Sequence, residues 1–173
     1  LTEDQIQEFF LKAKVVKDQK TKKGVTAPRR VTLSDGTLTH DAAFQSIDEE
    51  KQKAEFPGRL PEFNFRDSYH FNIAAYELGK LLGLSGMMPV TVEYKLKGKK
   101  GSLSWWLPVV MDLQDKTQQK VQAPDVNEWN KQMNRMWVFC ELVCDTDRNQ
   151  TNILITADWK LYMIDFTRAF RRQ

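Results

Sequence analysis

The stretch that most constrains this chain is DTDRNQTNILITADWKLYMIDFTRAF, which runs from Asp145 to Phe170. Two short apolar runs within it are each bounded by turn-forming residues, so the pattern predicts two short strands joined by a turn. Asp147 precedes the first run, and Asp165 ends the second run 18 residues later. Asn152 follows Asp147 by five residues in a tight loop. We expect these three polar side chains to meet in one cleft.

The three residues supply the groups that phosphoryl transfer requires. That reaction needs one carboxylate for the proton of the nucleophile, and a second carboxylate with an amide oxygen for the metal ions that bridge the phosphates. Hard oxygen ligands of this kind suit Mg²⁺ or Mn²⁺. Asp147, Asn152 and Asp165 therefore predict a metal-assisted phosphoryl-transfer site. The alternative is that both aspartates merely form turns and strand ends, since Asp favours turns.

The same stretch resembles the catalytic and metal-binding segments of protein-kinase-like enzymes. In those enzymes an Asp is followed five residues later by Asn, and then by a strand pair that ends in an Asp-Phe-Gly-type metal site. An Asp followed directly by Arg is most similar to the atypical branch, which contains phosphatidylinositol 3-/4-kinases, HipA-type kinases and the Golgi secretory-pathway kinases. Upstream, AAFQSID and FRDSYHFNIAAYELGKLLGLSGMMPVTVEY are similar to the third strand, regulatory helix and fourth strand of the secretory-pathway group. The resemblance runs from about Gly24 to Phe170.

The resemblance implies a role for individual residues. Asp147 corresponds to the catalytic aspartate, and Asn152 and Asp165 correspond to the metal ligands. Ala43 corresponds to the small residue over the adenine, two residues before the usual lysine. The implied cofactors are ATP with Mg²⁺ or Mn²⁺, and the implied partners are the nucleotide and an acceptor of unknown identity.

The expected phosphate contacts depart from the family pattern. Gln45 stands where the lysine is usual, and Asn72 stands where its glutamate partner is usual, with Glu77 one turn further on. Gln and Asn can hydrogen-bond each other and a phosphate, but a charged contact is about twice as strong as a neutral one. The metal motif also reads DFT, with Thr167 in the usual place of glycine.

No G-x-G-x-x-G motif precedes the second expected strand, and Gly24 in TKKGVTAPRR is the only glycine there. This glycine lies in a basic segment, residues 12–30, which holds eight Lys or Arg residues and one acid, Asp18. The segment is either a local anion site or a solvated basic hairpin. The residues that we expect to supply positive charge for the phosphates are Lys22, Lys23, Arg29 and Arg30.

The favoured function is ATP- and metal-dependent phosphoryl transfer by an atypical kinase to an unknown acceptor, either a protein or a small molecule. A pseudokinase that binds nucleotide or acts as a scaffold without catalysis is the first alternative, and the neutral residues Gln45 and Asn72 favour it. The second alternative is a protein that binds anionic partners through the basic segment and uses no nucleotide. Arg148 is expected to pair with a local carboxylate, and Arg168 contacts either a phosphate or a neighbouring acid.

The predicted fold is α+β and protein-kinase-like. Residues 1–112 are expected to form a β-rich, N-lobe-like part with an antiparallel sheet and one packed, regulatory-type helix. Residues 113–173 are expected to form a reduced, partial C-lobe with a long helix and the catalytic and metal-binding ribbon. Three explanations for so small a second lobe are open: the chain is a fragment, a C-terminal tail is missing from the numbered chain, or a minimal lobe is enough for function.

Local patterns predict the individual elements. Thr2 and Gln5 resemble a capping box at the start of a short helix, and the Asp-Gly pair in residues 34–37 predicts a hairpin. Side chains alternate along a strand, so Ala43 and Gln45 should share one of its faces. Residues 49–63 are polar and contain Pro and Gly, which predicts a loop.

Two longer helices are expected further along. The first is amphipathic and should end at Gly83, and the second should begin near Asp125. The apolar stripe predicted for the first helix is Phe71, Ala74, Ala75, Leu78, Leu81 and Leu82. The face predicted for the second helix is Trp129, Met133, Met136, Trp137 and Cys140.

Composition limits the remaining possibilities. The 173 residues are 41% hydrophobic and 28% charged, which is ordinary for a globular protein that buries its own core. A net charge of +3 is too small to indicate nucleic-acid binding, and no apolar run approaches the length of a membrane span. Cys140 and Cys144 lie four residues apart on an expected helix, which favours buried free thiols over a disulfide. No signal peptide is visible, so the compartment stays open between the cytoplasm and processing with export.

Overall fold

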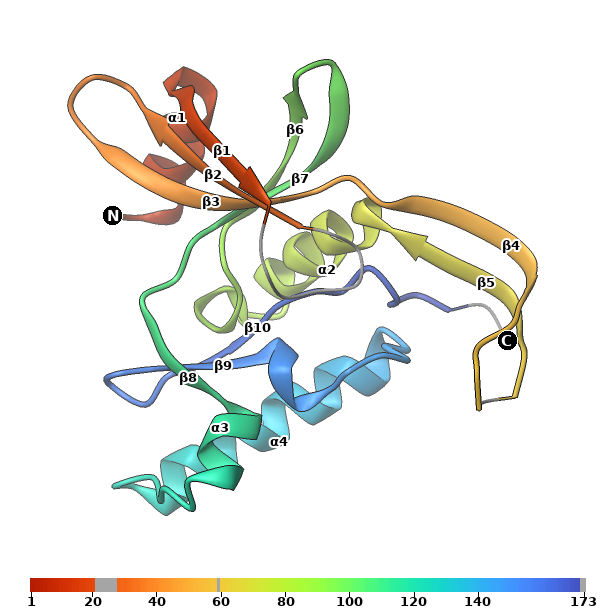
Figure 1. The fold of residues 1–173 in the computed structure, drawn as a ribbon. Helices are drawn as coiled ribbons and strands as arrows, with labels where there is room; N and C mark the ends of the chain where they lie inside the picture. Colours follow the sequence, from red (N-terminus) through yellow and green to blue (C-terminus); the bar gives the residue numbers. More distant parts are fainter. Residues whose placement is uncertain (21–27, 59, 172–173) are drawn as a thin grey trace.

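The computed structural model describes residues 1–20, 28–58 and 60–171. The chain folds as α+β with antiparallel sheets and a few helices (Figure 1). In chain order the elements are α1 (Glu3–Lys12), β1 (Lys14–Lys20), β2 (Arg29–Ser34), β3 (Thr39–Gln45), β4 (Asp48–Ala54), β5 (Glu62–Ser68), α2 (Tyr69–Leu81), the 3₁₀ turn η1 (Ser85–Met87), β6 (Thr91–Leu96), β7 (Lys99–Trp105), β8 (Val109–Asp112), α3 (Leu113–Gln118), α4 (Val126–Leu142), the 3₁₀ turn η2 (Gln150–Asn152), β9 (Ile153–Thr156) and β10 (Leu161–Met163).

The largest sheet has five strands in the order β1-β2-β3-β7-β6, and all neighbours are antiparallel. The predicted hairpin joins β2 to β3, with Ser34 opposite Thr39. Gly36 has a φ of 95°, a left-handed conformation that glycine adopts without steric cost. The carboxylate of Asp35 accepts hydrogen bonds from the backbone N–H groups of Thr37 and Leu38, both at 2.8 Å. The sequence prediction of this hairpin is confirmed.

Strand β3 alternates between two environments. Ala42 and Phe44 are buried in the core, 0% and 2% exposed, whereas Ala43 and Gln45 are half-buried on the opposite face. The predicted alternation is therefore confirmed. Helix α1 begins at Thr2 with the predicted capping box, and it contributes to the buried side of the fold, where its aromatic rings pack against Trp105.

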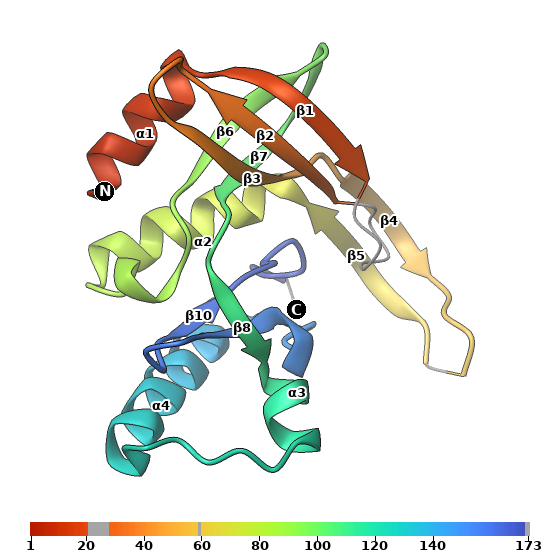
Figure 2. The same cartoon turned by 60° about the vertical axis from the view of Figure 1, so that its left-hand side comes forward.

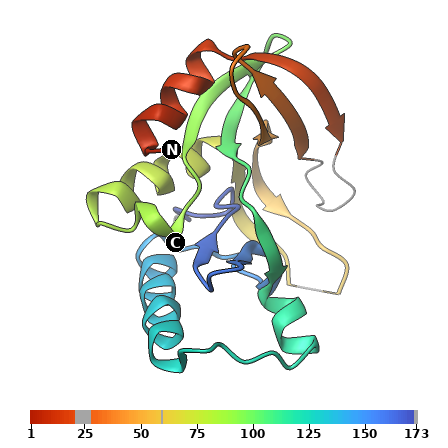
Figure 3. The same cartoon turned by 90° about the vertical axis from the view of Figure 1, so that its left-hand side faces the viewer.

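Helix α2 lies against β6 and β7 (Figures 1 and 3). Its predicted apolar stripe is wrong at Ala74, which is exposed, and at Leu81 and Leu82, which are 84% and 49% exposed. The buried residues are instead Tyr69, Asn72, Ala75, Tyr76 and Gly79. The buried face differs from the predicted one because polar groups on the inward side are hydrogen-bonded. The Tyr76 hydroxyl, for example, donates to the Glu3 carboxylate at 3.1 Å. The predicted end of the helix is confirmed by Gly83, whose φ is 70°.

Residues 49–63 do not form the loop that the sequence predicts. Most of them belong to the β4–β5 hairpin, which projects away from the five-stranded sheet (Figure 2). All residues of β4 except Ala54 are exposed, so the strand shows none of the apolar alternation that marks a half-buried strand. One cross-strand pair, Glu50 and Arg66, brings opposite charges together, whereas Glu49 faces the acid Asp67.

A three-stranded sheet in the order β10-β9-β8 lies next to helix α4 (Figure 1). The ribbon of β9 and β10 is the strand pair predicted from the sequence, with Met163 opposite Ile153. Strand β8 and helix α3 were not predicted as separate elements. Because β8 pairs with β9, this sheet crosses the expected boundary between residues 112 and 113.

Helix α4 begins after its N-cap residue Asp125, as predicted. Met136 and Cys140 are buried, whereas Trp137 is 45% exposed and lies outside the buried face. Both cysteines are free, but Cys144 is exposed, so the prediction of a buried thiol holds only for Cys140. Burial raises the pKa of the Cys140 thiol, which keeps that group protonated.

The two parts of the molecule share one hydrophobic core. Buried residues of α1 and the five-stranded sheet, such as Phe9 and Leu33, belong to the same cluster as Phe139 of α4 and Ile155 of β9. Figure 3 shows the upper sheet with α1 and α2 above the ribbon and α4. Among the described residues, no helix is long and apolar enough to cross a membrane.

Candidate functional site

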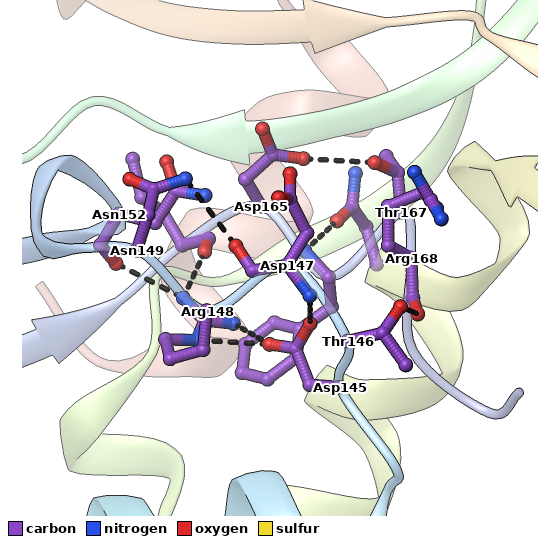
Figure 4. Close-up of polar contacts among 12 residues, drawn as sticks. Asp145, Thr146, Asp147, Arg148, Asn149, Asn152, Asp165, Thr167 and Arg168 are labelled. Carbon is purple, nitrogen blue, oxygen red and sulfur yellow. Dashed lines mark hydrogen bonds and ion pairs between the residues drawn. The ribbon is translucent and has the colours of Figure 1, made fainter. Parts of the chain in front are cut away.

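The β9–β10 ribbon brings the two predicted metal ligands to the same end of a strand pair. The backbone N–H of Ile164 donates to the carbonyl of Asn152 at 3.1 Å, one step beyond the last ladder pair. Asp165 follows directly and has a φ of 58°, a left-handed conformation that Asp adopts more readily than most residues. In Figure 4 the carboxylates of Asp147 and Asp165 point to the same side of the ribbon. The sequence prediction that these acids converge agrees with this arrangement.

The loop that carries Asp147 is held by its own side chains. The carboxylate of Asp145 accepts a hydrogen bond from the Asp147 backbone N–H at 3.2 Å. The amide of Asn149 donates to the Asp147 carbonyl at 3.3 Å, and its oxygen accepts from the Thr151 backbone N–H at 3.0 Å. These bonds cap η2 and fix the backbone on both sides of Asp147, whose side chain lies at the exposed surface.

Arg148 is structural, as the sequence prediction favoured. Its guanidinium is 2% exposed and pairs with the Asp145 carboxylate, which is fully buried, with Nε at 2.9 Å from Oδ2. It also donates to the carbonyl groups of Asn152 and Ile164, at 3.0 and 2.5 Å. Its Cζ atom lies over the Phe166 ring, 4.3 Å from the ring centroid. One buried side chain thus ties the Asp147 loop to both strands of the ribbon (Figure 4).

A chain of neutral amides links the five-stranded sheet to Asp165. The side-chain amide of Gln45 donates to Asp165 Oδ1 at 3.2 Å, across 120 residues of sequence. The amide of Asn72, on α2, donates to the Gln45 side-chain oxygen at 2.6 Å and to the Ser102 hydroxyl at 3.1 Å. Gln45 therefore faces Asp165, and Asn72 supports it from the helix.

The same helix holds the segment that follows Asp165. The backbone N–H of Phe166 donates to the Asn72 side-chain oxygen at 2.7 Å. The backbone N–H of Ser68, which caps α2, donates to the Thr167 carbonyl at 2.9 Å. The Thr167 hydroxyl donates to Asp165 Oδ1 at 3.1 Å, so this threonine makes a contact that glycine could not make. Helix α2 and its cap residue are thus joined to the segment after Asp165 at two successive residues, Phe166 and Thr167.

Asp67 is a further acid near this loop that the sequence analysis did not single out. Burial raises the pKa of Asp67, while the Thr167 hydroxyl and the charge of Arg168 act in the opposite direction. One of its oxygens, Oδ1, is buried without a hydrogen-bond partner in the described part of the chain. Its position on a strand that the sequence did not predict explains why no local signal identified it.

Of the four basic residues expected to supply positive charge, the described ones are already paired. Arg29 lies 2.6 Å from Asp18, whose pKa is lowered by this bond and by Lys97. Arg30 pairs with Asp41 and lies over the ring of Trp106, 4.4 Å from its centroid. Lys22 and Lys23 lie outside the described residues.

Arg30 differs from Arg29 in the face that it occupies. It stands opposite Ala43 in the β2–β3 ladder, so it shares a face with Ala43 and Gln45. Burial alone would raise the pKa of Asp41, but hydrogen bonds from Thr32 and Arg30 lower it, which keeps the carboxylate charged. The structure thus brings Arg30 to the face that carries Gln45.

Two predicted residues lie apart from this group. Glu77 is exposed on α2, and its carboxylate lies 3.3 Å from the ammonium of Lys80 on the same helix. The contacts of Asn72, and not of Glu77, reach Gln45. Arg168 contacts the neighbouring acid Glu62, which is one of the two alternatives expected for it.

The oxygen atoms of Asn152 and Asp165 suit a small hard cation, but they are too few to hold it without phosphates or water. Asn152, 9% exposed, and Asp165 supply an amide and a carboxylate oxygen. Neither hydrogen bond to the Asp165 carboxylate described above involves its Oδ2 atom. Among the described residues no group of three or more His, Cys, Asp or Glu side chains forms a metal site. Mg²⁺ commonly binds through one or two carboxylates together with substrate phosphates and water, so two protein ligands are compatible with it.

The sequence analysis did not identify several residues that hold the candidate site residues in place, such as Asp145 and Ser102. Asp145 could have been found from its place three residues before Arg148, whereas Ser102 and Asp67 carry no local signal. No protein-family model matches the chain, and the search of curated proteins found no match.

Proposed function

We propose that this protein is an atypical, kinase-like phosphotransferase that moves the γ-phosphoryl group of ATP to a hydroxyl-bearing acceptor. The observation that carries the proposal is the contact of Gln45 with Asp165, at 3.2 Å. It joins a sheet strand to the end of the ribbon at the two positions where a phosphate contact and a metal ligand are expected. The loop of Asp147 lies beside the same ribbon end.

The arrangement of the elements supports the same proposal. An antiparallel five-stranded sheet with one packed helix lies above a long helix and a two-stranded ribbon, in the chain order expected of a kinase-like fold (Figure 1). The cross-layer bonds of Asn72 correspond in place to the contact between the regulatory helix and the phosphate-binding strand. The first part is therefore assigned to nucleotide binding, and the second to metal binding and proton transfer.

In the proposed reaction, the acceptor oxygen bonds to the γ-phosphorus while the bond between that phosphorus and the β–γ bridging oxygen breaks. The products are a phosphorylated acceptor and ADP. Asp147 accepts the proton that the acceptor hydroxyl loses as its oxygen forms the new phosphate ester. The exposed side chain of Asp147 is accessible to an acceptor from solvent. Arg148 takes no part in this chemistry, because its guanidinium is occupied by Asp145 and two carbonyl groups.

Asn152 and Asp165 would hold Mg²⁺ or Mn²⁺ together with the nucleotide phosphates. A bound cation supplies charge neutralisation of the phosphates. The protein contributes the position of its two oxygen ligands, which the Ile164–Asn152 backbone bond and the Gln45 and Thr167 hydrogen bonds define.

The test is a comparison of nucleotide binding with and without divalent cation. ATP should raise the melting temperature more with Mg²⁺ or Mn²⁺ than with a chelator, and Asp165→Ala should remove the difference. Transfer from labelled ATP should require Asp147, so Asp147→Asn should bind ATP but lose transfer. Equal ATP affinity with chelator and with metal would show the proposed metal site to be wrong.

A pseudokinase is the second candidate, and one observation favours it. The side chains of Gln45 and Asn72 are neutral and already satisfied by each other, by Ser102, by Asp165 and by the Phe166 backbone. A site without a lysine at this position holds phosphates less firmly. Nucleotide binding without measurable transfer in the parent protein, and none gained in Gln45→Lys, would support this candidate.

A further inference from the structure

A charged pocket of about 480 Å³ lies beside the candidate site. Its walls come from the β4–β5 hairpin, from Phe71 at the start of α2, and from residues 168–171. Thr146, which also lines it, is the residue directly before Asp147. The pocket therefore shares one loop with Asp147, and one of its walls begins three residues after Asp165. Its volume is within the range of small-ligand sites, roughly 300–1,000 Å³.

The charges around this pocket are unequal. Three guanidinium groups line it, those of Arg66, Arg168 and Arg171, against the two carboxylates of Glu50 and Glu62. Glu62 contacts Arg168 directly and lies 3.9 Å from Arg171, so one carboxylate is shared by two cations. Glu50 lies 4.0 Å from Arg66 and its side chain is 75% exposed, which leaves this pair weak. The pocket thus presents more positive charge than its own acids neutralise.

Aromatic rings hold two of these guanidinium groups in place. Arg168 lies over Phe65 at 4.3 Å from the ring centroid, and Arg66 lies over Phe71 at 5.4 Å. The Arg168 side chain is 14% exposed, and its Nε–H has no hydrogen-bond partner in the described part of the chain. A planar guanidinium that is fixed by stacking loses little freedom when it binds a carboxylate or phosphate through two parallel hydrogen bonds.

We propose that this pocket binds the anionic group, a carboxylate or a phosphate, of a small acceptor that also carries the hydroxyl to be phosphorylated. The inference rests on the proposed phosphotransferase function, since it assigns the acceptor to the loop that carries Asp147. Arg66, Arg168 and Arg171 bind the anion, and Glu62 sets its affinity by competing for two of the three cations. The size of the pocket favours a small molecule as the acceptor.

The test is an NMR titration that follows the arginine Nε–H signals. The probes are glycerol 3-phosphate, glycerate, inorganic phosphate and glycerol. The three anions should shift the Arg168 signal, whereas glycerol should not. The relative affinities of glycerol 3-phosphate and glycerate identify which anionic group the pocket prefers.

Variants connect the signal to the pocket. Arg66→Gln and Arg171→Gln, both at partly exposed positions, should each weaken binding of the preferred anion about three- to tenfold. Glu62→Gln should tighten it, because a competing carboxylate is removed. Arg135→Gln, on the exposed surface of α4 and outside the pocket, is the matched control and should leave the affinity unchanged.

The possible outcomes distinguish a failure of the pocket proposal from a failure of the proposed ATP site. If no anion moves the Arg168 signal, or if Arg66→Gln and Arg171→Gln bind it like the control, the pocket proposal is wrong even where ATP binds. If the anions bind as expected but ATP produces no thermal shift with Mg²⁺, the proposed function fails and the acceptor role fails with it. Binding of both, each lost only in its own variants, supports the acceptor site.

Discussion

Two groups of side chains hold the segment after β10. They differ in charge and in how far apart in the sequence their contacts lie. The first, here called the charged anchor, is Arg148 with Asp145, which are 2% and 0% exposed. The second, the amide anchor, is Asn72 with Gln45, which carry no charge. They meet at Phe166, whose ring lies over Arg148 and whose backbone N–H donates to Asn72. One short segment is thus held on one side by a buried charged pair and on the other by neutral amides.

The difference follows from what each anchor connects. All partners of the charged anchor lie within the C-terminal part, at most 18 residues from Arg148. Such a pair shapes one loop, and its two buried charges are paired locally. The amide anchor spans 27, 94 and 120 residues and joins two layers of the fold. Neutral amides suit that position because they can bind both an acid and a backbone N–H without leaving a buried charge unpaired.

The largest expected effect comes from breaking the charged anchor. Arg148→Met leaves the Asp145 carboxylate buried without its cation and should lower the free energy of unfolding by about 3–5 kcal/mol. Urea unfolding followed by circular dichroism measures this change. Lys131→Met is the control, because its ion pair with Glu128 is exposed and should contribute less than about 1 kcal/mol.

The double variant Arg148→Met with Asp145→Leu sharpens the result. It removes both charges, so it should recover part of the stability that the single variant loses. If Arg148→Met is no less stable than Asn72→Ala, the charged anchor is not the stronger of the two.

The amide anchor should have a smaller effect on stability. Asn72→Ala leaves the buried N–H of Phe166 without an acceptor and should lower the free energy of unfolding by about 1–3 kcal/mol. Asn134→Ala, at an exposed position of α4, is the matched control in the same urea experiment. Hydrogen exchange gives a second measurement: the Phe166 amide should exchange faster in Asn72→Ala and unchanged in the control. An unchanged exchange rate at Phe166 in both variants would contradict the role of Asn72.

The contrast between the anchors also shows what the sequence could predict. The spacing of Asp147, Asn152 and Asp165 predicted a ribbon with converging polar ends, because local turn and strand patterns determine that geometry. The pairing of Arg148 with a nearby acid was predictable for the same reason. The alternation along β3 placed Gln45 on its face correctly. Each of these features depends on residues that are close in sequence.

The features that the sequence did not predict depend on packing between distant elements. The buried face of α2 includes Asn72 and excludes Leu81, because partners on β7 and after β10 satisfy the amide. The β4–β5 hairpin is exposed along most of β4, so no hydrophobic period marked it. Asp67 lies on this hairpin, and its contact with the segment after β10 could not be inferred without the pairing of β4 with β5.

Changing the amide anchor into a charged one should affect nucleotide binding more than stability. Gln45→Lys places an ammonium group next to Asp165 and near the expected phosphates. A charged hydrogen bond contributes about 1.5–3 kcal/mol against roughly 1 kcal/mol for a neutral one, so ATP should bind about two- to thirtyfold more tightly. Titration of ATP with Mg²⁺, followed by calorimetry, measures the affinity.

Arg30→Gln belongs in the same titration, because Arg30 shares a face with Ala43 and Gln45. If Arg30 already binds the phosphates, its removal should weaken ATP binding more than Gln45→Ala does. Lys131→Gln, which loses an exposed pair with Glu128 on α4, is the control. If neither Gln45→Lys nor Arg30→Gln changes the affinity by more than about twofold (roughly 0.4 kcal/mol), this face does not bind phosphates.

The smallest expected effect concerns a carboxyl group that neither anchor neutralises. Burial raises the pKa of Asp67 above its usual value of 3.8, so the folded state favours the protonated acid. The resulting stabilisation is complete below pH 3.8 and is lost as the pH rises through the higher pKa of the folded state. Asp67→Asn abolishes this titration, so the variant should gain stability relative to the parent between pH 4 and pH 7. The gain in melting temperature should stay below the roughly 2–4 °C that corresponds to 1 kcal/mol in a chain of this size. Thermal unfolding at a series of pH values measures it, with the exposed Asp4→Asn as control. A constant difference between Asp67→Asn and the parent across this range would contradict the raised pKa.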